Sequence, residues 1–381
     1  MSFTPKQRML NAYKGIFSDR YPVAPEFWCY QPARILGVDM IQMELEVSHW
    51  QALKTSFTKY DVEGWGVGTP DRHPPDLSTH TRVEKIDERQ VRQITERTFR
   101  GKTFTSVRML DKDEPAWQVE YPVKDEADIP TYIDMLLDLD VPFDFNNAIR
   151  EHQDVGEDYL LELAIGLPFF DFLATFLGFE KAIFYLMAED PSVLEGYRQR
   201  HTEYLKECVR EACRKTTYES FFIGCGYSHN SLLGPKLWRR WDKPGLKAVA
   251  EEIHKHSRLM HIHLHGKCME SVPDLAEMGI DCVCPFERPP GGDIEGRQGL
   301  TKVRELLNGR VTMNGNVHTV ETLIRGTPDD VRAQVREIKE VFAGDPRLII
   351  GTGDQVGVGT PEENLLAMFD EAKKAFSMHP R

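Results

Sequence analysis

In the C-terminal two thirds of the chain, short apolar runs alternate with longer amphipathic stretches, and this alternation constrains the fold more than any other feature. A strand followed by a helix, repeated many times, predicts a parallel β-sheet. The regular spacing of the repeats favours an α/β fold of the closed (β/α)8 TIM barrel type over an open sheet. The expected strands are Tyr159–Ile165, Phe221–Gly226, Leu259–His265, Cys282–Phe286, Val311–Gly315 and Leu348–Gly353.

Amphipathic segments between these runs predict the outer helices. Two of them carry a helix-start pattern, Thr-Pro followed by two acidic residues, at Thr327 and at Thr360. In this pattern the threonine caps the helix and the acidic side chains face its positive end. The expected helices are Lys236–His256, Met269–Met278, Leu300–Leu307, Thr319–Arg325, Asp329–Phe342 and Glu362–Phe376.

The N-terminal part of the chain is less regular and predicts a helical and β embellishment of the barrel. We expect a helix over Thr4–Phe17 and barrel strands over Pro22–Phe27 and Asp61–Gly68. Charged and β-branched residues alternate over Thr81–Val107, which predicts an exposed antiparallel excursion. The simplest organisation is one barrel domain over residues 1–381, with an insertion at about residues 75–125 near the barrel mouth.

Net charge and cysteine content limit the classes of partner and the cellular compartment that we expect. The net charge of −13 disfavours nucleic acid and anionic membrane surfaces as partners. Seven cysteines without a dense, regular framework indicate free thiols in a reducing cytoplasm. The N-terminal residues lack the apolar core of a signal peptide, and no apolar run approaches the roughly 18 residues that span a bilayer. We therefore expect a cytoplasmic protein, whose oligomeric state the sequence leaves open.

Three histidines occupy alternate positions of one expected strand, at His261, His263 and His265. Because a strand has a period of two residues, all three should point to the same face, with His261 one layer deeper. Imidazoles on a buried strand are costly unless they find partners. The run is consistent with hydrogen-bonded core histidines, but three in register at a strand end favour a site that holds a metal or moves a proton.

Other polar residues lie where further strands end, which is the active-site end of such barrels. Two imidazoles and a carboxylate from another strand suit zinc, and Fe(II) shares this ligand set. Cys282 and Cys284 share a strand face, a pattern more typical of buried packing. We expect catalytic roles for Asp354, Glu287 and His261. The expected substrate-binding residues are Glu26, Trp28, Tyr30, Arg34, Cys225 and Asn316.

Several motifs resemble those of the uroporphyrinogen decarboxylase superfamily, namely the histidine strand, the Asn-Gly-Asn strand at 314–316 and the segment Ile-Gly-Thr-Gly-Asp-Gln-Val-Gly-Val-Gly-Thr-Pro at 350–361. The resemblance covers most of the chain and implies a (β/α)8 barrel. True uroporphyrinogen decarboxylases carry an Arg-Gln-Ala-Gly-Arg segment after the first strand. This chain keeps only Arg34 in that region, so porphyrinogen decarboxylation is not expected.

The corrinoid-linked methyltransferase branch of the superfamily is the more similar one. Its zinc ligands are a histidine and two cysteines, and the matching positions here are His263, His265 and Asp354. Both thiolates are thus replaced by other metal-competent side chains, and Glu287 is a candidate fourth ligand or base. The resemblance therefore implies a Zn²⁺ site, with another divalent metal as an alternative.

The expected function is transfer of a methyl group from a small O-methylated substrate to a corrinoid carried by a partner protein. One alternative is a decarboxylase or lyase that uses Asp354, His263 and Arg34 on a small carboxylated substrate. A second alternative is a non-catalytic barrel that binds a small ligand. We also expect Lys339 to be exposed, so that Lys339→Ala would leave activity intact.

Overall fold

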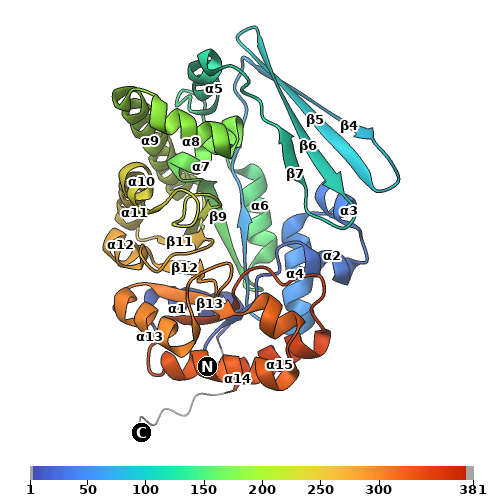
Figure 1. The fold of residues 1–381 in the computed structure, drawn as a ribbon, viewed down its shortest axis with the longest axis vertical. Coiled ribbons are helices and arrows are strands. Elements are labelled where there is room, and N and C mark those ends of the chain that lie inside the picture. The colour runs from blue at the N-terminus through green and yellow to red at the C-terminus, as the bar shows by residue number, and fades with distance from the viewer. Residues whose placement is uncertain (1–2, 375–381) are drawn as a thin grey trace.

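The structure, a computed structural model that describes residues 3–374, contains eight parallel strands in the neighbour order of a (β/α)8 barrel (Figure 1). The predicted barrel is confirmed, and every expected barrel strand is present to within a few residues. The strands in barrel order are β1 (Val23–Ala24), β2 (Trp65–Gly68), β9 (Leu160–Gly166), β10 (Ser220–Cys225), β11 (Leu259–Leu264), β12 (Cys282–Pro285), β13 (Thr312–Val317) and β14 (Leu348–Thr352).

The seam between β1 and β2, the two ends of this sheet, is bridged by a buried carboxylate. Glu63, two residues before β2, accepts a hydrogen bond from the backbone N–H of Val23 in β1 at 2.8 Å. The same carboxylate pairs with Arg20 at 2.7 Å and with Arg8 at 3.0 Å. Because two guanidinium groups and a backbone amide surround it, this buried charge is fully compensated and links both edges of the sheet.

Helix α1 (Pro5–Lys14) closes the amino-terminal end of the barrel. The Thr312 hydroxyl, at the start of β13, donates to the carbonyl of Ala12 at 2.7 Å. The Arg347 guanidinium, just before β14, donates to the carbonyl of Tyr13 at 2.5 Å. The Tyr13 side chain is fully buried and its hydroxyl lies 3.1 Å from His261 Nδ1 inside the barrel. The floor of the barrel is therefore sealed from solvent.

The strand register decides which side chains enter the barrel and which pack against the helices. In the β10–β11 pair, Phe222 lies opposite His261 and Gly224 opposite His263, so these positions face the interior. Cys225 follows Gly224 and therefore points outward with Leu264, into the large core between sheet and helices. A smaller cluster fills the interior and includes Trp65, Leu160, Phe222, Cys282, Cys284 and Ile349.

The helices surround the sheet on its outer side (Figure 1). Within residues 3–374, no helix combines the length and apolar character needed to cross a bilayer. Besides α1, the helices are α2 (Tyr30–Leu36), α3 (Met40–Leu45), α4 (His49–Tyr60), η1 (Glu126–Asp128), α5 (Ile129–Leu136), α6 (Asn146–Val155), α7 (Phe169–Leu177), α8 (Phe179–Ala188), α9 (Pro191–Lys215), α10 (Pro235–Trp241), α11 (Lys243–Lys255), α12 (Val272–Met278), α13 (Gly296–Leu307), η2 (Thr319–Ile324), α14 (Pro328–Val341) and α15 (Glu362–Lys373).

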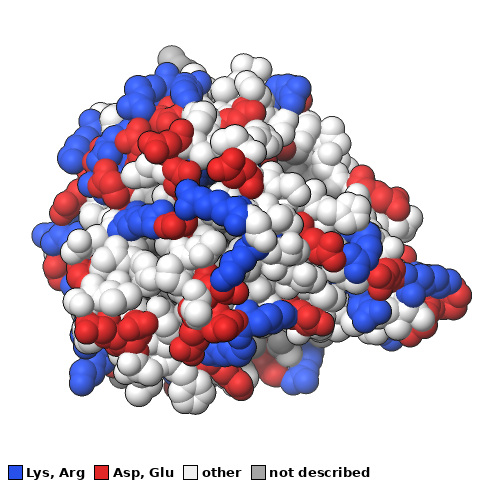
Figure 2. All heavy atoms as spheres, turned by 90° about the horizontal axis from the view of Figure 1, so that it is seen from above, with Lys and Arg blue, Asp and Glu red and all other residues white. Residues whose placement is uncertain are grey.

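The predicted antiparallel excursion is a four-stranded sheet that projects from the barrel (Figure 1). Exposed ion pairs link its neighbouring strands, such as Arg82 in β4 (Leu77–Lys85) with Glu96 in β5 (Gln90–Phe99), at 3.0 Å. In Figure 2 both signs of charge are interspersed over the face seen from above, including the projecting part. The excursion comprises β4, β5, β6 (Lys102–Asp111) and β7 (Trp117–Glu120), and β3 (Asp71–Arg72) pairs separately with β8 (Phe143–Asp144).

The helix expected over Lys236–His256 is instead two helices, α10 and α11, that meet at Asp242. Pro244 in the first turn of α11 has no N–H to continue the hydrogen bonding of α10, which accounts for the break. The buried Asp242 carboxylate accepts hydrogen bonds from the Phe170 N–H at 2.8 Å and from the Ser228 hydroxyl. Asp242 therefore ties the helix break to α7 and to the loop after β10.

Three further expectations at the C-terminal end are corrected. Lys339 is buried rather than exposed, and its ammonium group donates to the carbonyls of Glu371 and Lys374 at 3.0 and 2.8 Å. Thr327 caps α14 as expected, whereas Thr360 does not cap α15, whose N-cap is Pro361. The helix expected to reach Phe376 ends at Lys373, and residues 375–376 lie outside the described residues.

Candidate active site at the carboxyl ends of the strands

The histidine strand places its three imidazoles in a line along the barrel interior, as the alternation predicted. His261 is fully buried, whereas His263 and His265 lie nearer the carboxyl end of β11. The Nε2 atoms of His263 and His265 face each other at 2.6 Å. Two imidazole nitrogens thus converge on one point at the mouth of the barrel.

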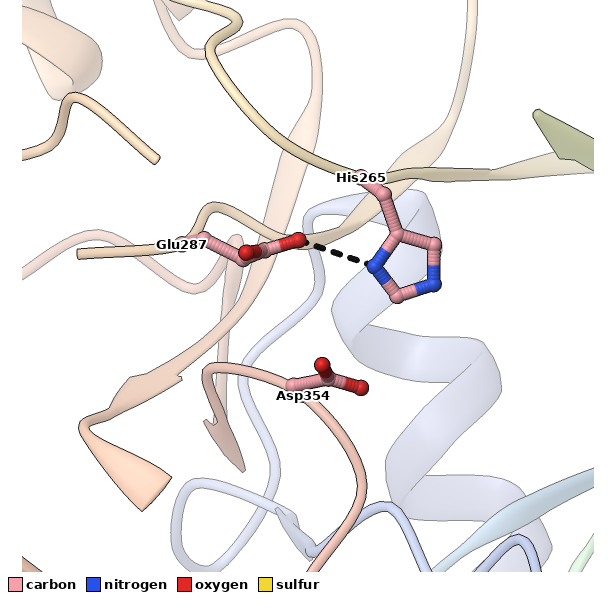
Figure 3. A group of neighbouring side chains, drawn as sticks. All are labelled: His265, Glu287 and Asp354. Atoms are coloured by element: carbon pink, nitrogen blue, oxygen red, sulfur yellow. Dashed lines mark hydrogen bonds and ion pairs between the residues drawn. The ribbon is translucent and has the colours of Figure 1, made fainter. Parts of the chain in front are cut away.

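Three carboxyl groups from three other strand ends surround this pair of histidines. Glu287, after β12, accepts a hydrogen bond from His265 Nδ1 at 2.8 Å. Potential ligand atoms of His265, Glu287 and Asp354 lie within 4.8 Å of one another, and Figure 3 shows the two carboxyl groups beside the imidazole ring. Glu26, after β1, lies 3.9 Å from His263 Nε2. The structure therefore brings together five residues that were predicted from the sequence.

Burial and mutual charge shift the pKa values of this cluster in opposite directions. Burial, and then the neighbouring Asp354, raises the pKa of Glu26 to about 8. Burial alone would lower the pKa of His265, but its hydrogen bond to Glu287 and the charges of Asp354 and Glu26 raise it to about 9. Burial and the two adjacent histidines hold the pKa of His263 well below its usual value. A neutral imidazole, an imidazolium and a protonated carboxyl group thus coexist near pH 7.

His261 occupies a deeper layer than the mouth. Its Nδ1 lies 2.7 Å from Glu162 Oε2, and its Nε2 lies 3.0 Å from Cys284 Sγ. The ring of Trp65 packs edge-on against it at a centroid distance of 5.1 Å, and Phe222 does the same at 5.3 Å. These rings and the barrel floor enclose His261, so the arrangement gives it partners within the protein and no open space for a substrate.

The predicted substrate-binding residues that follow β1 have different surroundings. Trp28 lies at the mouth and packs against Trp65, with ring centroids 5.8 Å apart. Tyr30 donates from its hydroxyl to Glu114, in the loop between β6 and β7, at 2.8 Å. Arg34 donates to the carbonyl of Thr360 at 3.0 Å and is exposed on the surface, so the structure does not bring it to the cluster.

Two other predicted residues lie apart from the histidines and carboxyl groups. Cys225 is buried in the outer core, because it follows the inward position Gly224 in β10. Asn316 is fully buried in β13, where its amide nitrogen donates to the carbonyl of Phe286 at 2.9 Å. Its side-chain oxygen accepts a hydrogen bond from Arg288 at 3.3 Å. Asn316 thus fixes the segment that leads to Glu287.

Two residues of the site had not been predicted from the sequence, Glu162 and Cys284. Glu162 is a single acidic residue within the apolar run Leu160–Ile165, and such a charge in a buried strand signals a specific partner. Cys284 shares a strand face with Cys282, and β12 pairs with the histidine strand so that Cys284 lies opposite His263. Cys284 meets the histidines only because β12 pairs with β11, which the sequence pattern does not show.

The chemistry of the donor set fits a divalent cation. Two imidazole nitrogens and one or more carboxylate oxygens are the ligands of zinc and of Fe(II) sites. The hydrogen bond from His265 Nδ1 to Glu287 leaves its Nε2 directed at His263, which is the usual orientation of a metal-bound histidine supported by a carboxylate. The group whose ligand atoms gather is His265, Glu287 and Asp354, which differs from the predicted ligands by Glu287 in place of His263, while His263 and Glu26 lie adjacent.

Residues 178–375 match the model of the family described as uroporphyrinogen decarboxylase (URO-D). A uroporphyrinogen decarboxylase from Paraburkholderia phytofirmans is 25% identical over 101 residues, which are 26% of this chain and 25% of that protein. The match therefore spans about a quarter of that relative's length. A methyltransferase from Methanosarcina mazei has a TM-score of 0.65 and 17% identity, with 97% of this chain and 98% of that chain covered. At this identity the likeness concerns the fold alone.

Proposed function

Because the chain belongs to the uroporphyrinogen decarboxylase family, whose model covers just over half of it, we propose that it is a metal-dependent methyltransferase. The proposed reaction moves a methyl group from a small O-methylated substrate to a corrinoid on a partner protein. The observation that carries the proposal is that His265, Glu287 and Asp354 gather at the barrel mouth, with His263 Nε2 2.6 Å from His265 Nε2. We propose His263, His265 and Asp354 as the ligands. A resident Zn²⁺, or another divalent metal, fits this set of donors.

The ligands favour an oxygen-linked methyl donor over a thioether. A bound divalent cation supplies Lewis-acid polarisation of a substrate oxygen. Imidazole and carboxylate are harder ligands than thiolates, and a harder site suits an oxygen substrate. Trp65 lies against His263 with ring centroids 5.6 Å apart, and Trp28 continues this aromatic surface. We infer that these rings contact the apolar part of the methyl donor.

Glu26 is suited to supply a proton to the substrate. When the bond between the methyl carbon and oxygen breaks, its electron pair stays on the oxygen, which then needs a proton or a cation. Glu26 retains its proton near pH 7, because its pKa is about 8, and it lies 3.9 Å from His263 Nε2. It can therefore donate that proton to the leaving oxygen and recover it from solvent after product release.

The partner protein must reach the mouth of the barrel, because the methyl group passes directly from the substrate to cobalt. The two segments that we propose to receive it are the excursion at residues 81–107 and the loop at residues 288–297. Tyr30 joins the mouth to the excursion through Glu114, so docking there is linked to the site. We propose these two segments as the contact surface for the corrinoid protein.

Metal content is the first test of the proposal. Protein purified without chelator, and again after reconstitution with zinc, is expected to hold about one divalent ion per chain by elemental analysis. His263→Ala is expected to lose that ion, whereas Lys302→Ala on the exposed face of α13 should retain it. An empty site in the wild-type protein after reconstitution would contradict the metal-dependent function.

The second test measures methyl transfer directly. Enzyme, reduced corrinoid protein and a series of alkyl and aryl methyl ethers are mixed, and the absorption spectrum of cobalamin reports methylation. Wild-type enzyme and Lys302→Ala are expected to methylate the corrinoid, and His263→Ala is not. Full conversion of a substrate without any corrinoid would exclude methyl transfer to a corrinoid.

A lyase is the second candidate, and one observation favours it. Decarboxylation ends with protonation of carbon, and Glu26 and His265 are two protonated groups side by side near neutral pH. Against it, the charged groups that surround Glu26 include Asp354 and Glu287, which repel a carboxylated substrate. Arg34 is also engaged with Thr360. A lyase would release carbon dioxide without a corrinoid, which the same assay detects.

A further inference from the structure

A continuous chain of hydrogen-bonding groups leads from the mouth into the closed floor of the barrel. It runs from His263 Nδ1 to Cys284 Sγ, at 3.0 Å, and from Cys284 Sγ to His261 Nε2, also at 3.0 Å. His261 Nδ1 continues it to Glu162 Oε2 at 2.7 Å, and the Ser220 hydroxyl donates to Glu162 Oε1 at 2.6 Å. Four barrel strands, β9 to β12, contribute these residues.

With both imidazoles neutral, proton counting leaves this series of hydrogen-bonding groups two self-consistent directions. A neutral imidazole carries one N–H and a thiol carries one S–H, so each of His261, His263 and Cys284 donates once and accepts once. If Glu162 is the terminal acceptor, His261 donates from Nδ1 and the Cys284 thiol donates to His261 Nε2. His263 then donates from Nδ1, and its Nε2 carries a lone pair.

The opposite direction would block the site. If Glu162 carried an additional proton and donated it to His261 Nδ1, each donor in the series would point the other way, and His263 Nε2 would carry a hydrogen. A metal ligand must present a lone pair, so this tautomer cannot bind a cation at Nε2. The direction of hydrogen-bond donation between Glu162 and His263 therefore decides whether His263 Nε2 can act as a metal ligand.

The surroundings favour Glu162 as the acceptor. Ser220 already donates to its other oxygen, and a carboxylate is the acceptor-only form of the side chain. Tyr13 competes for His261 Nδ1 at 3.1 Å, but the carboxylate oxygen is closer, at 2.7 Å. Both Glu162 and His261 are fully buried, so no solvent interrupts the chain.

We propose that Glu162, acting through His261 and Cys284, holds His263 in the Nδ1–H tautomer and so presents its Nε2 to the metal. Glu162 and Cys284 are positioning residues, since neither reaches the mouth. This series of hydrogen-bonding groups ends at the sealed floor of the barrel beside Ser220. It therefore orients a metal ligand and does not conduct protons to solvent. This inference rests on the proposed metal-dependent function.

The test interrupts the series of hydrogen-bonding groups at Cys284 and leaves the proposed metal ligands unchanged. In Cys284→Ala, His263 Nδ1 loses its acceptor, and affinity for Zn²⁺ in a chelator competition is expected to fall about 10–100-fold. Cys284→Ser keeps one donor and one acceptor and is expected to remain within a few-fold of wild type. Cys208→Ala, which removes another fully buried thiol in α9, is the matched control and should bind zinc normally.

A tautomer measurement separates orientation from simple packing. In ¹⁵N NMR spectra of the metal-free protein, His263 is expected to carry its proton on Nδ1 in wild type and to show mixed tautomers in Cys284→Ala. Glu162→Gln gives a second, less disruptive break, because an amide can donate or accept toward His261, and mixed tautomers are expected there as well.

The outcomes are distinguishable. Unchanged zinc affinity and an unchanged His263 tautomer in both Cys284→Ala and Glu162→Gln would overturn the inference. A sulfur-to-metal charge-transfer band in the Co²⁺-substituted protein would also overturn it, by making Cys284 a direct ligand. If the wild-type protein binds no metal but its His263 tautomer still depends on Cys284, the metal-dependent function fails while the orienting chain stands.

Discussion

Glu287 shows how one side chain organises the mouth. Its Oε1 accepts hydrogen bonds from His265 Nδ1 and from the Gly266 N–H, both at 2.8 Å. These two bonds fix the rotation of the His265 ring and direct its Nε2 toward His263. Burial raises the pKa of Glu287, but its hydrogen bonds outweigh burial and leave it lower than usual, so it stays ionised. Glu287 is thus suited to orient a ligand.

At the scale of single residues we predict that Glu287→Ala weakens zinc binding by about 10–100-fold without abolishing it, because the substitution removes the hydrogen bond that orients the proposed ligand His265. Asp354→Ala should have the larger effect, because it removes a proposed ligand itself. Isothermal titration with Zn²⁺ measures both. Equal affinities for wild type and Glu287→Ala would show that the carboxylate does not orient His265.

Residue type and strand period predicted much of the cluster, and strand phase accounts for one of the exceptions. The period-two pattern correctly placed His261, His263 and His265 on one face. The same rule shows why Cys225 is absent from the mouth, since it follows the inward position Gly224. Arg34 is absent for another reason, because the carbonyl of Thr360 is its partner. Such distant partners depend on tertiary contacts that no local pattern reveals.

The break between α10 and α11 has electrostatic consequences. Burial, together with the nearby Asp171, raises the pKa of Asp242 to about 7, even though hydrogen bonds from Ser228 and the Phe170 N–H stabilise its charge. In the unfolded chain Asp242 would titrate near its ordinary value of about 3.9. Below that pH both states are protonated and the group adds no pH dependence. As pH rises toward 7 the unfolded state releases its proton first, so stability falls and then levels off.

We therefore predict that Asp242→Asn flattens the dependence of stability on pH. Between pH 4 and pH 7.5 the free energy of unfolding of the wild type should fall, relative to the variant, by on the order of 2–4 kcal/mol. Urea denaturation at several pH values measures the difference. Parallel pH profiles for the two proteins would show that Asp242 ionises equally readily in both states.

The presence of each helix and strand was predicted more accurately than the residues at which it begins and ends. The excursion and all barrel strands follow from hydrophobic pattern, because each element has to bury one face. The helix boundary at Asp242 was missed although Pro244 signalled it. Lys339 was misplaced because its burial depends on the end of α15, whose carbonyls accept from its ammonium group.

The proposed ligands come from the ends of two strands that are not neighbours in the barrel, β11 and β14, so a bound metal would link distant parts of the molecule. His263 and His265 belong to the β11 end and Asp354 follows β14, while Glu26 follows β1. Any ligand that binds only the folded state stabilises it by mass action, by about 2.7 kcal/mol at one hundred times its dissociation constant. Metal binding should therefore be visible in global unfolding.

At the scale of the whole molecule we predict that saturating Zn²⁺ raises the melting temperature of the wild type by a few degrees and that a chelator reverses the rise. His263→Ala should melt at the same temperature with and without zinc, because it lacks a ligand. Differential scanning calorimetry measures both. An equal rise in wild type and His263→Ala would assign the effect to metal bound elsewhere on the protein.

The sequence by itself determined the class of fold and the face on which the histidines lie, since both follow from local periodicity and the need to bury apolar surface. It also identified the carboxyl groups at strand ends as candidates, because parallel strands deliver these positions to one end of a barrel. Only the tertiary structure decided that Glu162 and Cys284 join the histidines, since that depends on which strands are neighbours and in which register. Hydrogen-bond partners far apart in sequence are set by this packing, and the orientation of His263 follows from it.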